Sequence, residues 1–171
     1  SMDGEDENLP RRRTWYVLHV KPRTEKKVFD FLSGLRVFRY LPLLKKVTKV
    51  QRRRVVRHLP AFPGYVFTRL NADERRRLFE TQMIVRTLDV PFPRQLIHEL
   101  RQIEHASHRP ADFHVSTEYT VGQRVRVVSG PLLGLEGFVK REGRSASLVL
   151  ELSILGRALE ASVTPEDLQP M

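Results

Sequence analysis

The sequence predicts an α+β domain that is followed by a small all-β domain. In residues 14–106, segments that alternate in hydrophobicity come between segments with apolar residues at helical spacing, which is typical of an α+β fold. We expect an antiparallel sheet of four strands flanked by helices. From residue 118 to residue 171 every segment alternates and glycine turns separate them, which predicts a barrel of four or five strands. Residues 107–117 show no periodicity and are predicted to be a linker.

The positive charge of the chain is concentrated in its first third. The 171 residues carry a net charge of +10, and residues 9–60 contain sixteen Lys and Arg against two carboxylates. Residues 61–171 contain fourteen residues of each sign. This asymmetry favours a polyanionic partner, most commonly nucleic acid, while a charged surface that keeps the protein soluble is the alternative. Residues 1–13 are polar and predict a disordered tail.

The first elements of the N-terminal domain follow clear patterns. The segment 15–20 is aromatic and β-branched, which predicts a strand with His19 on the same face as Trp15. Thr24 is a suitable N-cap, and apolar residues at i, i+3, i+4 and i+7 predict a helix to about Leu35.

A basic segment follows that helix. After a short strand at 37–41, residues 43–59 predict two strands joined by a turn near 50–54, although the turn lacks Asn-Gly chemistry. Arg52, Arg53 and Arg54 would lie at the tip of this hairpin, where cationic side chains suit contact with phosphate. A charged edge that resists aggregation is an equally good interpretation.

The segment 62–67 is apolar on both faces of its predicted strand. Pro63 suits the start of a strand, Gly64 permits a bulge or a close backbone approach, and Tyr65 and Phe67 share one face. Such a strand is either covered on both faces or offers one face to a partner. A helix capped by Asn71 or Asp73, a strand at 83–88 and a helix at 94–105 complete the domain.

Catalysis and metal binding find little support in the sequence. Cysteine is absent, which excludes disulfides and thiolate metal sites. His105 and His108 have a spacing that could hold a metal, but no third ligand with a fitting spacing is evident. No phosphate-binding loop, nucleophile elbow or acidic pair is recognisable, and we expect neither catalysis nor a cofactor. No apolar run is long enough to span a membrane, so we expect a soluble cytoplasmic protein.

These segments together resemble the NusG family of transcription elongation factors. Trp15-Tyr16-Val17, Lys26-Lys27 and Phe62-Pro63-Gly64-Tyr65-Val66-Phe67 are similar to the NusG N-terminal (NGN) domain. Residues 121–168 look like a KOW domain, which is an SH3-like barrel, with Gly122, Gly130-Pro131 and Glu136-Gly137 at the matching positions. The charge and the departures from the pattern look more like a specialised, RfaH-like paralogue that acts in antitermination.

The resemblance implies binding surfaces for a monomeric protein that acts on RNA polymerase. In the family, the strand equivalent to 62–67 receives the clamp helices of the polymerase β′ subunit. The residues that would form this dock are His19, Phe62, Pro63, Tyr65 and Phe67. Lys21 and Arg23 match basic positions that lie near non-template or upstream DNA. In specialised members of the family, a His-Thr-Thr triplet reaches the polymerase β subunit. The matching region here reads Asp73-Glu74-Arg75-Arg76-Arg77 and lacks this triplet, so the resemblance leaves the β-subunit contact open.

The resemblance also implies a partner for the C-terminal domain. A turn after Gly130-Pro131 meets ribosomal protein uS-ten or the termination factor Rho in the family, usually through aromatic residues. Here Leu132, Leu133 and Leu135 occupy the turn, and we expect an apolar exposed surface, although one leucine could close the end of the barrel. The function implied is suppression of pausing and termination. The alternative is an RNA-binding or ribosome-associated KOW protein that acts without polymerase.

Overall fold

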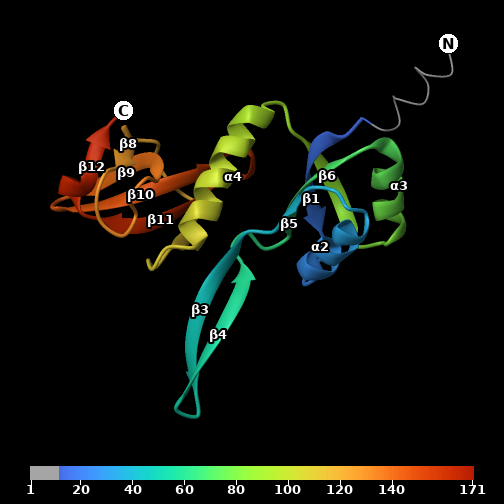
Figure 1. The fold of residues 1–171 in the computed structure, drawn as a ribbon, viewed down its shortest axis with the longest axis horizontal. Helices are drawn as coiled ribbons and strands as arrows, with labels where there is room; N and C mark the ends of the chain where they lie inside the picture. The colour runs from blue at the N-terminus through green and yellow to red at the C-terminus, as the bar shows by residue number, and fades with distance from the viewer. Residues whose placement is uncertain (1–11) are drawn as a thin grey trace. The chain divides into compact units, whose positions relative to one another are not determined.

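The computed structural model describes residues 12–171, which divide into two compact units (Figure 1). Unit 1 contains Leu59–Pro91 and the chain up to Leu43. Unit 2 contains Leu44–His58 and Phe92–Met171. The predicted tail at residues 1–13 lies almost wholly outside the described residues. The helix predicted at 94–105 therefore groups with the C-terminal part of the chain.

Unit 1 is built on a sheet of four antiparallel strands, as predicted. Its strands are β1 (Thr14–Val20), β2 (Arg39–Tyr40), β5 (Tyr65–Leu70) and β6 (Ile84–Asp89). Their order is β2-β5-β1-β6. The helices α2 (Glu25–Gly34) and α3 (Ala72–Glu80) contribute Val28, Leu32 and Leu78 to a buried core with Leu18 and Val66 of the sheet. One face of the sheet is thereby buried against these helices.

The ends of the two helices match the sequence patterns to different degrees. Asn71 caps α3, because its side chain accepts a hydrogen bond from Glu74 N and the Glu74 carboxylate accepts one from Asn71 N. Thr24 is the residue before α2, as predicted, but its side chain donates to the Lys21 carbonyl and does not cap the helix. The structure therefore confirms that Thr24 and Asn71 precede the two helices. It confirms a side-chain cap for α3 only.

The strands β3 (Leu43–Val50) and β4 (Arg53–Pro60) form a separate two-stranded ribbon, as predicted (Figure 1). Gln51 and Arg52 make the turn with φ values of 50° and 65°. Two consecutive residues with positive φ are typical of a type I′ turn, which usually takes Asn-Gly. The hairpin therefore has the turn type that is common in two-residue loops, although Gln51 and Arg52 are not residues that favour it.

Unit 2 is built on a six-stranded antiparallel sheet that carries one helix. Its strands are β7 (His114–Ser116), β8 (Arg124–Val127), β9 (Glu136–Glu142), β10 (Ser145–Leu152), β11 (Arg157–Val163) and β12 (Leu168–Pro170). They lie in the order β12-β8-β9-β10-β11-β7, so β12 and β7 are the edges. Short 3₁₀ turns occupy Ser153–Leu155 and Pro165–Asp167.

Two features of unit 2 differ from the sequence-based expectations. Strand β7 lies inside the predicted linker and pairs with β11, with Val115 opposite Leu159. Helix α4 (Pro93–Ser107) packs on β10, and its residues Leu96, Leu100, Ile103 and Ala106 are buried. Among the helices of residues 12–171, none has the length and apolar character needed to cross a membrane.

Candidate functional site

Three of the five predicted docking residues lie on the sheet face that is opposite α2 and α3, and Phe62 and Pro63 lie in the turn before β5. The register of β1 and β5 places His19 opposite Tyr65 and Val17 opposite Phe67. Residues that face each other across antiparallel strands point to the same side of the sheet. The side chains of the neighbouring residues Leu18 and Val66 belong to the helix-covered core. The structure therefore brings His19, Tyr65 and Phe67 together. Alternation predicted the shared face of Tyr65 and Phe67, and the family resemblance implied the place of His19 beside them.

His19 and Tyr65 form a partly exposed pair of stacked rings. Their centroids are 5.2 Å apart and their planes are inclined by 20°. Gly64 precedes Tyr65 with φ of +91°, and its carbonyl accepts a hydrogen bond of 2.8 Å from Val20 N. A Cβ atom at this position would lie 3.6 Å from His19 Cδ2, which is an ordinary contact distance, so the positive φ is what favours glycine here. The backbone of the turn before β5 therefore lies against the His19 ring.

The predicted docking residues differ in their exposure. Pro63 is exposed, and His19 and Tyr65 are partly exposed. Phe62 and Phe67 are buried, with exposed fractions of 1% and 0%. The expectation that both phenylalanine rings line an accessible hollow is therefore wrong for this structure. Of the predicted docking residues, Pro63, His19 and Tyr65 can be reached by a partner, whereas the two phenylalanine rings belong to the buried interior.

The basic residues that follow β1 lie beside this surface in the chain and are exposed. Lys21 and Arg23 occupy the turn between β1 and α2, where Lys21 N donates to the Met83 carbonyl at 2.8 Å. Arg23 has a φ of 64°, an unusual conformation for a residue with a side chain. Neither side chain forms an ion pair with the described residues. Both remain available to an anionic partner.

The segment at the start of α3 is occupied by internal ion pairs. Arg76 contacts Asp73 at 2.7 Å and Glu80 at 2.6 Å. Arg13 contacts Glu74 at 2.9 Å, and this hydrogen bond is the main reason why the pKa of Glu74 lies below its ordinary value. Asp73, Glu74 and Arg76 at the position predicted for a β-subunit contact are thus engaged in ion pairs within unit 1, whereas Arg77 is exposed and forms none with the described residues.

The hairpin formed by β3 and β4 exposes a high density of cations. Arg52 lies in its turn, and Arg53 and Arg54 open β4, as predicted. All three side chains are exposed. No ion pair within residues 12–171 involves them. This set is the largest group of uncompensated charge that the sequence analysis singled out.

The three leucines after β8 do not form one exposed surface. Leu132 and Leu135 are buried, with exposed fractions of 4% and 0%, whereas Leu133 is 52% exposed. Leu133 N donates to the Gly130 carbonyl, and Leu135 N donates to the Leu132 carbonyl, so the chain forms two successive tight turns. The expectation of three exposed leucines is wrong, because Leu132 and Leu135 are buried.

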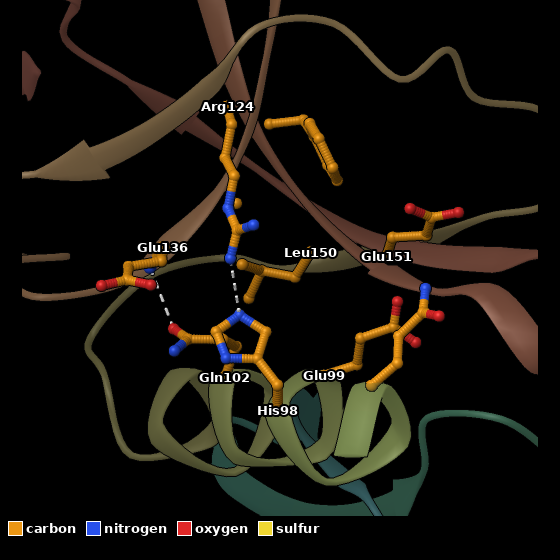
Figure 2. A pocket seen from close by; sticks show the side chains of 10 residues that line it. His98, Glu99, Gln102, Arg124, Glu136, Leu150 and Glu151 are labelled. Atoms are coloured by element: carbon orange, nitrogen blue, oxygen red, sulfur yellow. Dashed lines mark hydrogen bonds between the residues drawn. The ribbon is translucent and has the colours of Figure 1, made fainter. Parts of the chain in front are cut away.

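A pocket of about 220 Å³ lies between α4 and the sheet of unit 2 (Figure 2). The Glu99 carboxylate accepts hydrogen bonds from Ser153 N at 3.0 Å and Ser153 Oγ at 2.8 Å. Gln102 accepts a bond of 2.9 Å from Glu136 N, and Arg124 donates to His98 at 3.4 Å, as Figure 2 shows. These polar contacts join α4 to the sheet in addition to its apolar stripe.

Burial changes the acid–base properties around this pocket. Desolvation raises the pKa of Glu99, against the opposing effect of its hydrogen bonds from Ser153. Burial and a hydrogen bond to Glu151 raise the pKa of Tyr119 to about 12. This pocket was not predicted from the sequence, although Glu99 is a carboxylate on the same helical face as Leu96, Leu100 and Ile103.

The two histidines considered for metal binding both contact one carboxylate. His108 Nε2 lies 3.0 Å from Glu104 Oε1, and His105 Nε2 lies 3.8 Å from Glu104 Oε2. Over residues 12–171, no group of three or more His, Asp or Glu side chains is placed to hold a metal ion. The histidines are thus accounted for by helix-end contacts.

Comparison with protein families identifies the first part of the chain. Residues 13–103 match the family model NusG, described as transcription termination factor nusG. No curated protein matches the chain. The matched region covers all of unit 1 that the structure describes from residue 13 onward, the hairpin, and most of α4.

Proposed function

The chain belongs to the NusG family of transcription factors, and we propose that it binds RNA polymerase through the surface formed by Pro63, His19 and Tyr65. In this proposal the surface receives the clamp helices of the polymerase β′ subunit, and Phe62 and Phe67 hold it in shape from the core. The bound factor suppresses pausing and termination in the cytoplasm. No bond is formed or broken in this function.

The observation that carries the proposal is the stacked pair of His19 and Tyr65. Aromatic rings that are fixed in place and partly exposed are the side chains that most often dominate the energy of a protein interface. These rings stack on each other and belong to paired strands of the sheet, so little conformational entropy is lost when a partner covers them. Pro63 is exposed beside them and adds apolar area.

The effect on transcription follows from differential binding. A factor changes the balance between paused and active polymerase only if it binds the active state more tightly. Contacts with two parts of the polymerase that move relative to each other during pausing would provide this preference. Lys21 and Arg23, which are exposed beside the ring pair along the chain, are proposed to contact non-template or upstream DNA.

The C-terminal sheet is proposed to be a KOW domain that recruits a second factor, either ribosomal protein uS-ten or Rho. Leu133 is the leucine of the turn that such a partner can reach, because it is 52% exposed. A recruited factor that is tethered to polymerase has a high effective concentration at the elongation complex. Recruitment then needs only modest affinity.

Transcription through a terminator in vitro tests this proposal. The wild-type chain is expected to raise read-through by purified polymerase, and the double variant His19→Ala, Tyr65→Ala is expected to lose this effect. Phe92→Ala is the matched control, because it removes an exposed ring from another site. Equal read-through with the double variant and the wild type would contradict the role of the ring pair.

The cationic hairpin favours a second candidate function, RNA binding or association with ribosomes without polymerase. Its arginines have no carboxylate partner in the described chain, and such groups bind RNA phosphates as well as DNA phosphates. The two candidate functions lead to different expectations. If the chain acts by RNA binding, it binds RNA tightly without polymerase, and the double variant His19→Ala, Tyr65→Ala keeps its cellular function.

A further inference from the structure

The β3–β4 hairpin is a polycation without internal neutralisation. Residues 44–58 contain seven Lys and Arg and no carboxylate, and no Asp or Glu occurs anywhere in residues 31–72. The seven residues are Lys45, Lys46, Lys49, Arg52, Arg53, Arg54 and Arg57. All seven are exposed, and none makes an ion pair within residues 12–171. Elsewhere in the described chain, by contrast, Arg13, Arg76 and Arg126 each have a carboxylate partner.

The cations are divided equally between the two faces of the ribbon. The two-residue turn at Gln51 and Arg52 places Val50 opposite Arg53. Alternation along each strand then assigns the other six cations to faces. Face one carries Lys46, Arg53 and Arg57. Face two carries Lys45, Lys49 and Arg54.

Like charges that lie opposite each other weaken a hairpin, and an isolated two-stranded ribbon is marginally stable at best. With this register, Lys46 lies opposite Arg57 and Lys49 lies opposite Arg54. A ribbon that rested on a surface by one face would need cations on that face only. Cations on both faces are explained if both faces meet anions at once.

The ribbon also lacks the large aromatic rings on which unpaired bases most often stack, and His58 is the single aromatic ring of residues 43–60. Proteins that bind single strands stack the bases on aromatic rings. Residues 43–60 contain no Phe, Tyr or Trp. The exposed apolar side chains of the ribbon are Val47, Val50, Val56 and Leu59, with exposed fractions of 45%, 49%, 43% and 40%. These side chains can contact thymine methyl groups but cannot stack on a base.

We infer that the β3–β4 hairpin inserts into the major groove of duplex DNA, with each face directed to the phosphates of one strand. The major groove of B-DNA is about 12 Å wide and admits a two-stranded ribbon, whereas the major groove of A-form RNA is too narrow for side chains to read. Phosphates on both walls of the groove neutralise both faces of the ribbon. This inference rests on the proposed function and names the nucleic acid that the hairpin contacts in it.

The salt dependence of DNA binding by the full chain tests the inference. The face-one variant is Lys46→Gln, Arg53→Gln, Arg57→Gln, and the face-two variant is Lys45→Gln, Lys49→Gln, Arg54→Gln. The control Arg101→Gln, Arg141→Gln, Arg144→Gln has the same net charge change at exposed positions outside the hairpin. Affinity for a short DNA duplex is measured by fluorescence anisotropy over a series of salt concentrations, and circular dichroism verifies that each variant is folded.

Each face variant is expected to reduce the slope of log K against log[salt] by about 2.7, since each lost phosphate contact removes about 0.9. The control is expected to keep the wild-type slope. A loss of slope in only one face variant would show that the ribbon lies on DNA by one face, which overturns groove insertion. Slopes equal to the control in both variants would overturn DNA binding by the hairpin.

The same assay with single-stranded DNA and with duplex RNA tests the class of nucleic acid. Binding is expected to be at least tenfold weaker to both than to duplex DNA at equal salt. Equal or tighter binding to either would overturn the assignment to duplex DNA. Because no polymerase is present, failure here leaves the ring pair and its read-through assay untouched, and failure of that assay leaves the DNA result standing.

Discussion

The different roles assigned to Phe67 and Tyr65 can be separated by truncating each ring. Phe67 has an exposed fraction of 0% and lies opposite Val17 in the middle of the sheet. Removing a fully buried phenylalanine ring usually costs about 3–5 kcal/mol, so Phe67→Ala should lower the free energy of unfolding of unit 1 by that amount. Tyr65 is partly exposed and stacks on His19, and such a pair contributes about 0.5–1.5 kcal/mol. Tyr65→Ala should therefore cost about 1 kcal/mol.

Urea unfolding followed by Trp15 fluorescence measures both values. Trp15 is the single tryptophan of the chain and lies in β1, so its emission reports on unit 1. The wild-type chain and Phe92→Ala serve as references. A loss below about 1 kcal/mol for Phe67→Ala would refute the assignment of this ring to the packed interior. If Tyr65→Ala lowered the free energy of unfolding as much as Phe67→Ala does, Tyr65 would be a structural residue.

Three further predictions concern other parts of the structure. Glu99 has a pKa above the ordinary 4.5, so it favours folding while protonated, and its contribution is lost as the pH rises through its native pKa. Glu99→Gln should remove this loss of stability. The free energy of unfolding, measured by far-UV circular dichroism, should therefore differ less between acidic and neutral pH in the variant than in the wild type. Asn71→Ala should cost about 1 kcal/mol in Trp15-detected unfolding, because it removes the cap of α3, whereas Asn71→Gly should cost a few tenths. Leu133→Asp should change the stability of unit 2 by less than about 0.5 kcal/mol, since the side chain is exposed, and Leu135→Asp should destabilise it severely. Unit 2 variants with equal stability would contradict the burial of Leu135.

Much of the fold could be predicted because its elements have simple periods. The strand at 15–20, the helix after Thr24 and the helix capped by Asn71 each combine a period with a start signal, and the structure contains all three. The short strand β7 could not be predicted in the same way. Its three residues are too few to show a period, and pairing with β11 determines its conformation.

The burial of the site residues was harder to predict than their positions. Alternation showed that Tyr65 and Phe67 share a face, but a period cannot show how far cover extends across that face. Phe67 lies beside Val17 at the centre of the sheet, whereas Tyr65 lies next to Gly64 at the end of β5. The same holds for the leucine turn. The geometry of its turns determines that Leu133 is exposed and that Leu132 and Leu135 are buried, and three leucines in a row of turn residues do not reveal this from the sequence.

The affinity of the chain for core RNA polymerase tests the central claim most directly. The wild-type chain is expected to bind core polymerase with or without a nucleic-acid scaffold. The double variant His19→Ala, Tyr65→Ala is expected to bind at least about thirtyfold more weakly, since loss of an interface hot spot costs about 2 kcal/mol or more. Undiminished binding by a folded double variant would contradict the assignment of this surface to polymerase.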